Sequence, residues 1–443
     1  MLLLAPLLPC GHSTMSLTAP LGQQNDPGIK NNNSCHHVII IGAGPSGNIA
    51  GALLANKGYR VTILERSLFP RFSIGESLLP QCMEFIKEAG MLDAVVNAGF
   101  QYKDGASFVR GRKYTDFSFE NKFTAGIGTT FQVQRGTFDG LLAQEAERMG
   151  VEIRWQQEVL AADFSADRPK LSVRDAAGES LICEADFVLD ASGFGRILPK
   201  LLDLESPSGF PVRQALFTHV EDRIGDGARF DRNKIRITVH PEHEDVWYWL
   251  IPFSNGRSSL GVVARQAFFD SLPGDNKTAL RQVVGQDPSL TELLSKAEFD
   301  TPVNTITGYS ANVRSLYGKG YALLGNAGEF LDPVFSSGVT IAMKSASLAA
   351  AVLDRQFKGE AVDWQADYAR PLQRGVDTFR VFVDAWYDGR FQDVIFHDKQ
   401  RPEVKAMICA ILAGYAWDEN NPYVKNARSR LDTLAAFCRG DRE

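Results

Sequence analysis

The chain has 443 residues, of which 44% are hydrophobic and 23% charged, and its formal net charge is −6. This composition excludes a disordered, collagen-like or low-complexity chain, and the acidic balance argues against a nucleic-acid-binding surface. The six cysteines show no CxxC spacing, which argues against a zinc ribbon or a thioredoxin-like site and fits a reducing cytoplasm.

The N-terminal segment, residues 1–34, is rich in Gly, Pro, Asn, Gln and Ser, which predicts a disordered tail. Its Leu-rich start, residues 1–9, is too short to cross a bilayer. The first Lys or Arg of the chain is Lys30, so the charged region of a signal peptide is missing. We therefore expect no signal peptide, and no later stretch is apolar for long enough to predict a membrane span. The sequence leaves open whether Met1 or Met15 is the true start.

The strongest motif is a strand, a glycine-rich turn, a helix and a second strand that ends at an acid. The unbroken apolar run at 36–41 predicts a buried parallel strand, and the run at 59–64 predicts its neighbour. Between them, GAGPSG permits a tight bend, and the helix N-terminus presents free N–H groups to a pyrophosphate. A glycine-rich turn of another α/β protein is the alternative. The predicted dinucleotide-binding residues of this unit are Gly42, Gly44, Ser46, Gly47 and Glu65.

Two later segments, 186–193 and 321–328, read as strands that return to the same sheet and run into glycine-rich loops. A helix is predicted at 140–149, and Arg135 ahead of it is placed to neutralise a pyrophosphate; a surface arginine is the alternative. Only one dinucleotide fingerprint is present. We therefore predict a site for FAD and no second site for a nicotinamide cofactor. The residues assigned to FAD here are Arg135, Asp190, Ser192, Gly193 and Asn326.

In this order, GxGxxG, Asp-Ala-Ser-Gly and Gly-Asn-Ala-Gly resemble the flavoprotein class typified by para-hydroxybenzoate hydroxylase. Three further segments resemble the flavin-dependent halogenases: residues 69–80, WYWLIP at 247–252 and FLDPVFSSG at 330–338. Phe335, within the last of them, makes the resemblance closest to the phenol and pyrrole branch of that family. The resemblance covers about residues 36–360. It implies an α/β fold with a Rossmann-like FAD-binding domain, an antiparallel substrate-domain sheet and a C-terminal helical region.

The expected domains are discontinuous. We expect the FAD-binding domain at 35–110, 130–205 and 300–360, the substrate-domain sheet at 111–129 and 206–299, and the helical region at 361–443. Within the substrate domain, a helix is predicted near 277–298. The resemblance assigns further FAD contacts to Arg66, Ser73, Ile74, Gly75, Glu76, Asp332, Gly338 and Val339.

The resemblance also implies the chemistry. Reduced FAD from a separate flavin reductase reacts with oxygen, and chloride or bromide is oxidised to hypohalous acid at the flavin. A halide needs N–H donors, and the amides of Ser337 and Gly338 offer two; a loop that only contacts the flavin is the alternative. Trp247 and Trp249 share one face of a strand and would wall the flavin from the substrate, unless they are only a packed aromatic face.

Lys103 is the candidate catalytic residue, because the family's lysine precedes a similar Gly-Ala strand. Burial in an aromatic cavity lowers the pKa of an amine, which then holds hypohalous acid or forms a haloamine near neutral pH. Lys113 and Lys122 have weaker claims. The candidate catalytic set is Lys103, Trp247 and Trp249.

The chain departs from the family at three positions. Val246 stands where the family usually has Gly, and Asn326 stands where many members have Asp. Phe335 occupies the place of the glutamate that tryptophan halogenases carry before Ser-x-Gly. A phenol or pyrrole is activated by its own heteroatom, so Phe335 favours such a ring over free tryptophan. The sequence leaves open whether the ring is free or held by an acyl or peptidyl carrier protein.

The leading hypothesis is therefore a cytoplasmic FAD-dependent halogenase of a small phenolic or pyrrolic substrate, without a nucleic-acid partner. The alternative is a monooxygenase or dehydrogenase of the same fold that does not halogenate, and a non-catalytic flavin-binding protein is a third reading. His240 and His243 invite a metal site, but no further ligands follow at useful spacing, so no metal is predicted.

Overall fold

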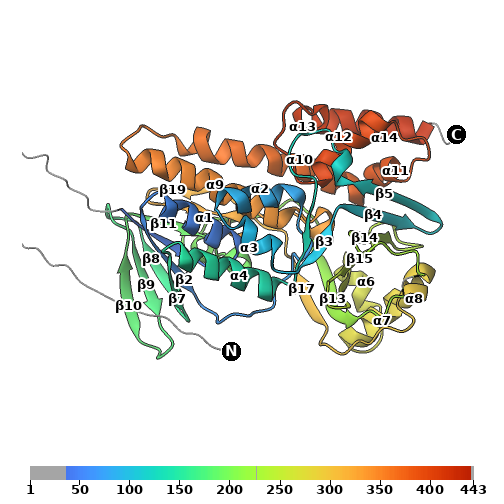
Figure 1. Cartoon of the computed structure of the whole chain (residues 1–443), viewed down its shortest axis with the longest axis horizontal. Helices are drawn as coiled ribbons and strands as arrows, with labels where there is room; N and C mark the ends of the chain where they lie inside the picture. The colour runs from blue at the N-terminus through green and yellow to red at the C-terminus, as the bar shows by residue number, and fades with distance from the viewer. Residues whose placement is uncertain (1–35, 226, 441–443) are drawn as a thin grey trace, which may run out of the picture. The chain divides into compact units, whose positions relative to one another are not determined.

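The computed structural model describes residues 36–225 and 227–440 (Figure 1). The predicted tail at 1–34 and the question of Met15 lie outside these residues. In the described part, a six-stranded sheet has the order β19-β20-β11-β1-β2-β7, parallel except at β19. Its strands are β1 (His37–Ile41), β2 (Arg60–Glu65), β7 (Glu152–Trp155), β11 (Phe187–Asp190), β19 (Tyr317–Gly318) and β20 (Tyr321–Leu323).

The runs predicted to be buried strands form β1 and β2, which confirms the Rossmann-like reading. Nearly every residue of these strands is buried, as expected for parallel strands with both faces covered. Helix α1 (Pro45–Asn56) follows β1 and packs against α4 (Arg135–Arg148) and α9 (Ser337–Phe357). The helix predicted at 140–149 begins earlier, as α4 (Arg135–Arg148), because an Arg135–Asp139 ion pair at i, i+4 stabilises its first turns.

A seven-stranded sheet has the order β17-β13-β16-β15-β14-β4-β5, antiparallel except between β14 and β4. This mostly antiparallel sheet confirms the predicted second layer. Its strands are β4 (Gly105–Arg110), β5 (Lys113–Ser118), β13 (Arg213–Glu221), β14 (Lys234–Val239), β15 (Trp247–Pro252), β16 (Arg257–Arg265) and β17 (Asn304–Thr307).

Alternation along β15 gives the seven-stranded sheet two different faces. Trp247, Trp249 and Ile251 belong to the main core, whereas Tyr248 and Leu250 belong to a separate cluster with side chains of α7 (Asn276–Gln286) and α8 (Pro288–Leu293). All of β15 is buried because each face is covered.

The single helix predicted near 277–298 is two helices, because Pro288 cannot continue α7 and starts α8 instead. The Asp287 side chain caps α8 by accepting the Leu290 N–H at 2.9 Å.

The remaining elements are short sheets and helices around these layers. The small strands are β3 (Gln101–Lys103), β6 (Thr130–Gln132), β8 (Glu158–Asp163), β9 (Lys170–Arg174), β10 (Ser180–Glu184), β12 (Glu205–Ser206) and β18 (Asn312–Val313). The other helices of the first 360 residues are α2 (Pro80–Glu88), α3 (Leu92–Val96), α5 (Ile197–Leu201), α6 (Gln266–Asp270), α7 (Asn276–Gln286), α8 (Pro288–Leu293) and α9 (Ser337–Phe357).

The C-terminal region is helical, as predicted, and follows a π-helical turn at Gln365–Ala369. Its helices are α10 (Arg370–Tyr387), α11 (Arg390–Ile395), α12 (Pro402–Leu412), α13 (Pro422–Lys425) and α14 (Ala427–Gly440). The expected domain boundaries stay a prediction, because sheet membership does not define a domain; β4, for example, pairs with β14 in the seven-stranded sheet. Across residues 36–225 and 227–440, none of the helices combines the length and the apolar character that a membrane span needs.

We expect Gly261→Ala to destabilise the sheet, because Trp249 lies across Gly261 of β16. A Cβ at Gly261 would stand 2.2 Å from Cζ2 of that indole. The indole must shift, and the free energy of unfolding, measured by urea denaturation, should fall by about 1–3 kcal/mol. In the control Gly285→Ala, the new Cβ meets open space on α7, and stability should stay equal or rise by up to about 1 kcal/mol. Equal stability of both variants would contradict this packing.

Candidate active site

A cavity of about 480 Å³ opens at the carboxyl ends of β1, β2 and β11. Its walls come from the turn after β1, residues 65–77, the loop at 191–195, β15 and the loop at 326–339. Cofactors commonly bind at this end of parallel strands, in cavities of about 300–1,000 Å³.

The cavity brings together most of the predicted site residues. Those that line it are Gly42, Gly44, Ser46, Glu65, Arg66, Ser73, Ile74, Gly75, Glu76, Arg135, Ser192, Gly193, Trp247, Trp249, Asn326, Gly338 and Val339. Those that do not line it are Gly47, Lys103, Asp190, Asp332 and Ser337. The role of each residue stays a prediction.

The glycines of the turn after β1 have different structural reasons. Gly42 has φ +99°, which favours glycine, and a Cβ on Gly47 would stand 2.0 Å from the Gly42 carbonyl oxygen. A Cβ on Gly44 would meet only an Arg71 nitrogen, at 3.7 Å. Gly42 and Gly47 therefore shape the turn, whereas Gly44 keeps the cavity side of the helix N-terminus open.

Glu65 lines the cavity and also has a structural role. Its Oε2 accepts the Ala43 N–H and its Oε1 accepts the Ser67 N–H, each at 2.9 Å. The carboxylate therefore ties the turn after β1 to the end of β2, which fixes the distance between the two halves of a nucleotide site.

Three arginines line the cavity: Arg66 and Arg135, which the sequence predicted, and Arg71, which it did not. The Arg135 guanidinium bonds both carboxylate oxygens of Asp139, at 2.7 and 2.8 Å, and the Ile74 carbonyl at 2.6 Å. Arg71 lies beside Gly44, with its Nη2 3.5 Å from the same carboxylate. Because Asp139 offsets much of the Arg135 charge, Arg71 is the more available partner for a phosphate.

The loop before α9 is built to present polar groups. Ser336 adopts φ +55°, the left-handed conformation, and α9 begins at the next residue. The Ser337 hydroxyl and the Asn326 Oδ1 are buried without a hydrogen-bond partner in the described part of the chain. Unpaired buried oxygens are costly unless a ligand bonds them. Of these two residues Asn326 lines the cavity, and its orphaned oxygen, the open face of Gly44 and the cavity volume together fit bound FAD.

Asp190 supports the neighbouring loop from behind. Its carboxylate accepts the backbone N–H groups of Ser192 and Leu198, at 2.9 and 2.7 Å. Burial raises the pKa of this carboxyl group. Asp190 thus holds the 191–195 loop in place without reaching the cavity itself.

The two tryptophans of β15 form one wall of the cavity. Their rings are 5.9 Å apart between centroids and inclined at 47°. The Trp247 Nε1–H donates to the Tyr387 hydroxyl at 2.9 Å, and the Trp249 Nε1–H donates to the Ser259 hydroxyl at 3.0 Å. Each indole is therefore fixed by a specific bond as well as by packing.

Lys103 lies next to the cavity but is fully enclosed by protein. Its Nζ donates to the Ser77 hydroxyl and the Leu78 carbonyl, both at 2.7 Å, and lies 5.3 Å from the Phe119 ring centre. Burial lowers the pKa of the amine to about 7. Since Ser77 lines the cavity, one hydroxyl group stands between that space and the amine.

Phe335 is buried among aromatic rings. It packs edge-on against Trp386 and Phe391, with centroid distances of 6.0 and 5.5 Å. The position therefore offers no acid or base.

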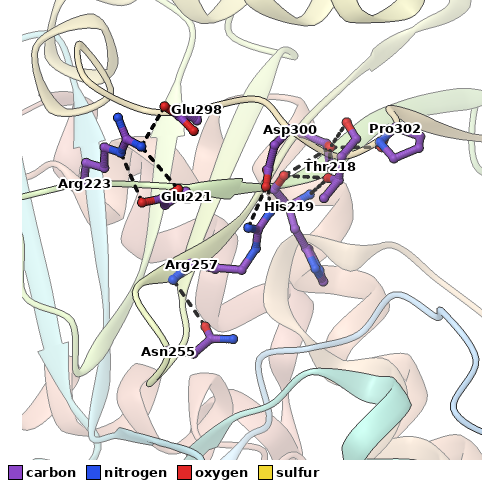
Figure 2. Close-up of polar contacts among 10 residues, drawn as sticks. Thr218, His219, Glu221, Arg223, Asn255, Arg257, Glu298, Asp300 and Pro302 are labelled. Atoms are coloured by element: carbon purple, nitrogen blue, oxygen red, sulfur yellow. Dashed lines mark hydrogen bonds and ion pairs between the residues drawn. The ribbon is translucent and has the colours of Figure 1, made fainter.

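Four residues of this site were missed from the sequence. Arg71 lies within a segment that carried the resemblance, and Asp139 stands at i+4 from Arg135, so both had a local signal. Tyr387 and His219 had none, because their partners are distant in the chain. His219 Nε2 is 2.7 Å from Glu76 Oε1. Figure 2 shows His219 on β13 beside Thr218. The Thr218 hydroxyl is hydrogen-bonded to the Thr301 hydroxyl and to the Pro302 carbonyl.

The histidines considered for a metal site have other partners. His240 Nε2 is 2.8 Å from the Gln286 side-chain oxygen, and its Nδ1 accepts N–H groups from Glu242 and His243. Among the residues described, no three His, Cys, Asp or Glu groups gather in a metal-binding arrangement.

Comparison with known proteins agrees with this geometry. Residues 36–371 match the family model described as an FAD binding domain. A flavoprotein/dehydrogenase structure from Cytophaga hutchinsonii is 43% identical, with a TM-score of 0.89 over 93% of this chain and 100% of that one. The tryptophan 2-halogenase of Chondromyces crocatus is 30% identical over 73% of this chain, and the match spans 62% of that enzyme's length. A 1H-pyrrole-2-carbonyl-[peptidyl-carrier protein] brominase of Pseudoalteromonas luteoviolacea is 26% identical over 86% of this chain and 93% of the relative.

We expect Gly44→Ala to weaken FAD binding without changing the fold. Gly44 has φ −75°, which alanine adopts freely, and the added methyl group would project into the cavity where a pyrophosphate approaches the backbone. FAD affinity, measured by equilibrium dialysis, should fall by about tenfold or more, and urea denaturation of the apoprotein should be unchanged. Unaltered affinity would place the dinucleotide elsewhere.

We expect the Lys103 amine to make stability depend on pH. In the unfolded chain a lysine stays protonated up to about pH 10.4, whereas burial holds the folded pKa near 7. Between these values the unfolded chain binds more protons, so this group raises the free energy of unfolding as pH rises, by up to about 1.4 kcal/mol per pH unit.

Lys103→Met removes this titration. The unfolding free energy of the unmodified protein minus that of the variant should therefore increase from pH 7 to pH 9 in urea titrations. The same difference for the exposed Lys87→Met is the control and should stay flat. A flat difference for Lys103→Met as well would show that the amine titrates alike in both states.

Proposed function

Because the chain belongs to the FAD binding domain family, we propose that it is an FAD-dependent halogenase that uses reduced flavin and oxygen to halogenate a phenol or pyrrole. The family match and the halogenase relatives support an enzyme of the flavin-dependent oxidoreductase type. The proposal adds the halide, the ring and the roles of this chain's residues.

The observation that carries the proposal is the buried amine of Lys103. A lysine with neutral hydrogen-bond partners and a pKa of about 7 is partly uncharged at neutral pH. An uncharged amine has a lone pair, which an ammonium lacks, and so it can bind or react with an electrophilic halogen. A lysine kept only for structure would gain more from a carboxylate partner or from solvent.

The cavity and the helix N-terminus beside it supply the other requirements. When bound in reduced form, FAD would supply one pair of electrons to oxygen and the halide would supply the second pair, so that one oxygen atom leaves as water and the other joins the halogen as hypohalous acid. The N-terminus of α9, with the amides of Ser337 and Gly338 and the unpartnered Ser337 hydroxyl, provides donors for the halide. Trp247 and Trp249 exclude the aromatic substrate from this part of the cavity.

The halogen then reaches the substrate through Lys103. The neutral amine holds hypohalous acid by a hydrogen bond, or forms a haloamine: nitrogen bonds to the halogen, an N–H proton joins the hydroxide, and water leaves. The ring next attacks the halogen: a carbon–halogen bond forms, the nitrogen–halogen bond breaks with its electron pair going to nitrogen, and the proton that the ring loses restores the amine. Ser77 lines the cavity and its hydroxyl accepts a hydrogen bond from Nζ, so this residue marks the route between the two sites.

The substrate class follows from what surrounds Phe335. An aromatic cluster at this position has no base to assist a poorly activated ring, which favours a phenol or pyrrole. The similarity to pyrrolyl-carrier-protein halogenases supports a carrier-held substrate.

Electrons would come from a separate flavin reductase. The cytoplasmic location stays a prediction.

A second function has its own support. The Cytophaga hutchinsonii structure, at 43% identity, is named a flavoprotein/dehydrogenase. In this alternative the chain oxidises or hydroxylates its substrate without a halide, and Lys103 serves the substrate as a hydrogen-bond partner.

The experiment supplies chemically reduced FAD, oxygen and bromide with resorcinol, and detects brominated product by mass spectrometry. We expect bromination by the unmodified protein and a loss of about a hundredfold or more in Lys103→Met, which keeps the side-chain volume. The matched control is Lys122→Met. That lysine is also partly buried, with a lowered pKa, but it bonds the Gly126 carbonyl away from the cavity.

Three outcomes separate the readings. Bromination that depends on Lys103 and not on Lys122 supports the halogenase. Oxidation of NADH or NADPH by the purified protein alone, without brominated product, supports the alternative. Bound FAD with neither activity would leave only the flavin-binding role.

A further inference from the structure

A chain of hydrogen bonds joins the tryptophan wall to the loop before α9. The Trp247 Nε1–H donates to the Tyr387 hydroxyl at 2.9 Å, and that hydroxyl donates to Asp332 Oδ2 at 2.9 Å. The Tyr309 hydroxyl donates to the same carboxylate oxygen at 3.2 Å, and Asp332 Oδ1 accepts the Val334 N–H at 3.0 Å. One carboxylate thus fixes two tyrosines and the start of the loop.

This network is dry and charged. Trp247 is 1% exposed, Asp332 2% and Tyr309 5%. The Arg213 guanidinium, 4% exposed, lies over the Tyr387 ring with its central carbon 3.3 Å from the ring centre. Burial raises the pKa of Asp332 to about 6, and the nearby arginine opposes that rise. At neutral pH the carboxylate is therefore charged, and it binds its tyrosines strongly.

The tyrosine in the middle of the network comes from a late part of the chain. Tyr387 is the last residue of α10, whereas the match to the FAD binding domain ends at residue 371. The C-terminal helical region therefore contributes a group to the wall that the FAD binding part of the chain does not provide.

We propose that Tyr387 is a positioning residue that holds the Trp247 indole across the cavity wall, with Asp332 as its fixed anchor. The Tyr387 hydroxyl accepts the indole N–H and donates to the carboxylate at the same time, which a phenylalanine ring cannot do. With Tyr387 in place, the indole cannot turn, and the wall between the flavin and the aromatic ring stays closed. The inference rests on the proposed halogenation, because the wall retains an oxidant only if one is made.

The chain offers a matched pair of variants. Tyr387→Phe removes the acceptor of the Trp247 N–H and one donor to Asp332. Tyr309→Phe also removes one donor to Asp332 but leaves the indole bond intact. A difference between the two variants therefore reports on Trp247 and not on the carboxylate.

The first measurement needs no activity. In ¹⁵N-labelled protein the indole N–H signal of Trp247, identified by its absence from Trp247→Phe, should exchange slowly with solvent. In Tyr387→Phe it should shift and exchange about tenfold faster, and in Tyr309→Phe it should not change. A fast-exchanging Trp247 signal in the unmodified protein would overturn the inference, even if Tyr387→Phe failed to fold.

The second measurement is the fraction of oxidised bromide that reaches the substrate. Brominated product and hypobromous acid captured by an external scavenger are counted in one reaction with reduced FAD. We expect the delivered fraction to fall about tenfold in Tyr387→Phe and little in Tyr309→Phe. In a Trp247→Phe background, Tyr387→Phe should add no further loss, because the tyrosine acts through the indole.

Equal delivered fractions in the two tyrosine variants would overturn the positioning role, as would a full additional loss in the Trp247→Phe background. If the unmodified protein makes neither brominated product nor hypobromous acid, the proposed function fails. The indole exchange experiment then still decides whether Tyr387 positions Trp247.

Discussion

The burial of the Lys103 amine among neutral partners is the constraint on which the site depends. A charged ammonium in a dry interior is costly, and the Ser77 hydroxyl and the Leu78 carbonyl offer dipoles rather than an opposite charge. The folded protein meets this cost by lowering the pKa of the amine to about 7. The same feature that reduces stability gives a nucleophilic amine at neutral pH, and the surrounding packing must be rigid enough to keep water and acids away.

That packing comes from the meeting of two sheets. The parallel sheet places its glycine-rich turn and the loop before α9 around one cavity, and β15 of the second sheet closes it. Alternation along β15 sends Trp247 and Trp249 to the cavity and Tyr248 to the opposite core. The wall is fixed by hydrogen bonds to Ser259 and, across the chain, to Tyr387 at the end of α10. In the proposed function, FAD binding and the separation of the two chemical steps therefore use different layers of one structure.

Sequence patterns within short segments predicted much of this architecture. Contacts between residues that are distant in the chain could not be predicted in this way. The Rossmann-like unit was predictable because apolar runs, glycines and Glu65 lie within about thirty residues of sequence. The extent of α4 and the break at Asp287 were missed because an ion pair and a proline, rather than periodicity, decide them. The partners of Asp332 could not be predicted, since Tyr309 and Tyr387 reach it only through the fold.

The ionisation of Lys103 in the folded protein tests the central claim most directly. In protein labelled with ¹⁵N at lysine side chains, the chemical shift of the Lys103 Nζ can be followed against pH, with the signal identified by its absence from Lys103→Met. The account predicts a titration midpoint near pH 7. An amine that remains protonated beyond pH 9 would contradict it, because a permanent ammonium has no lone pair with which to accept a halogen.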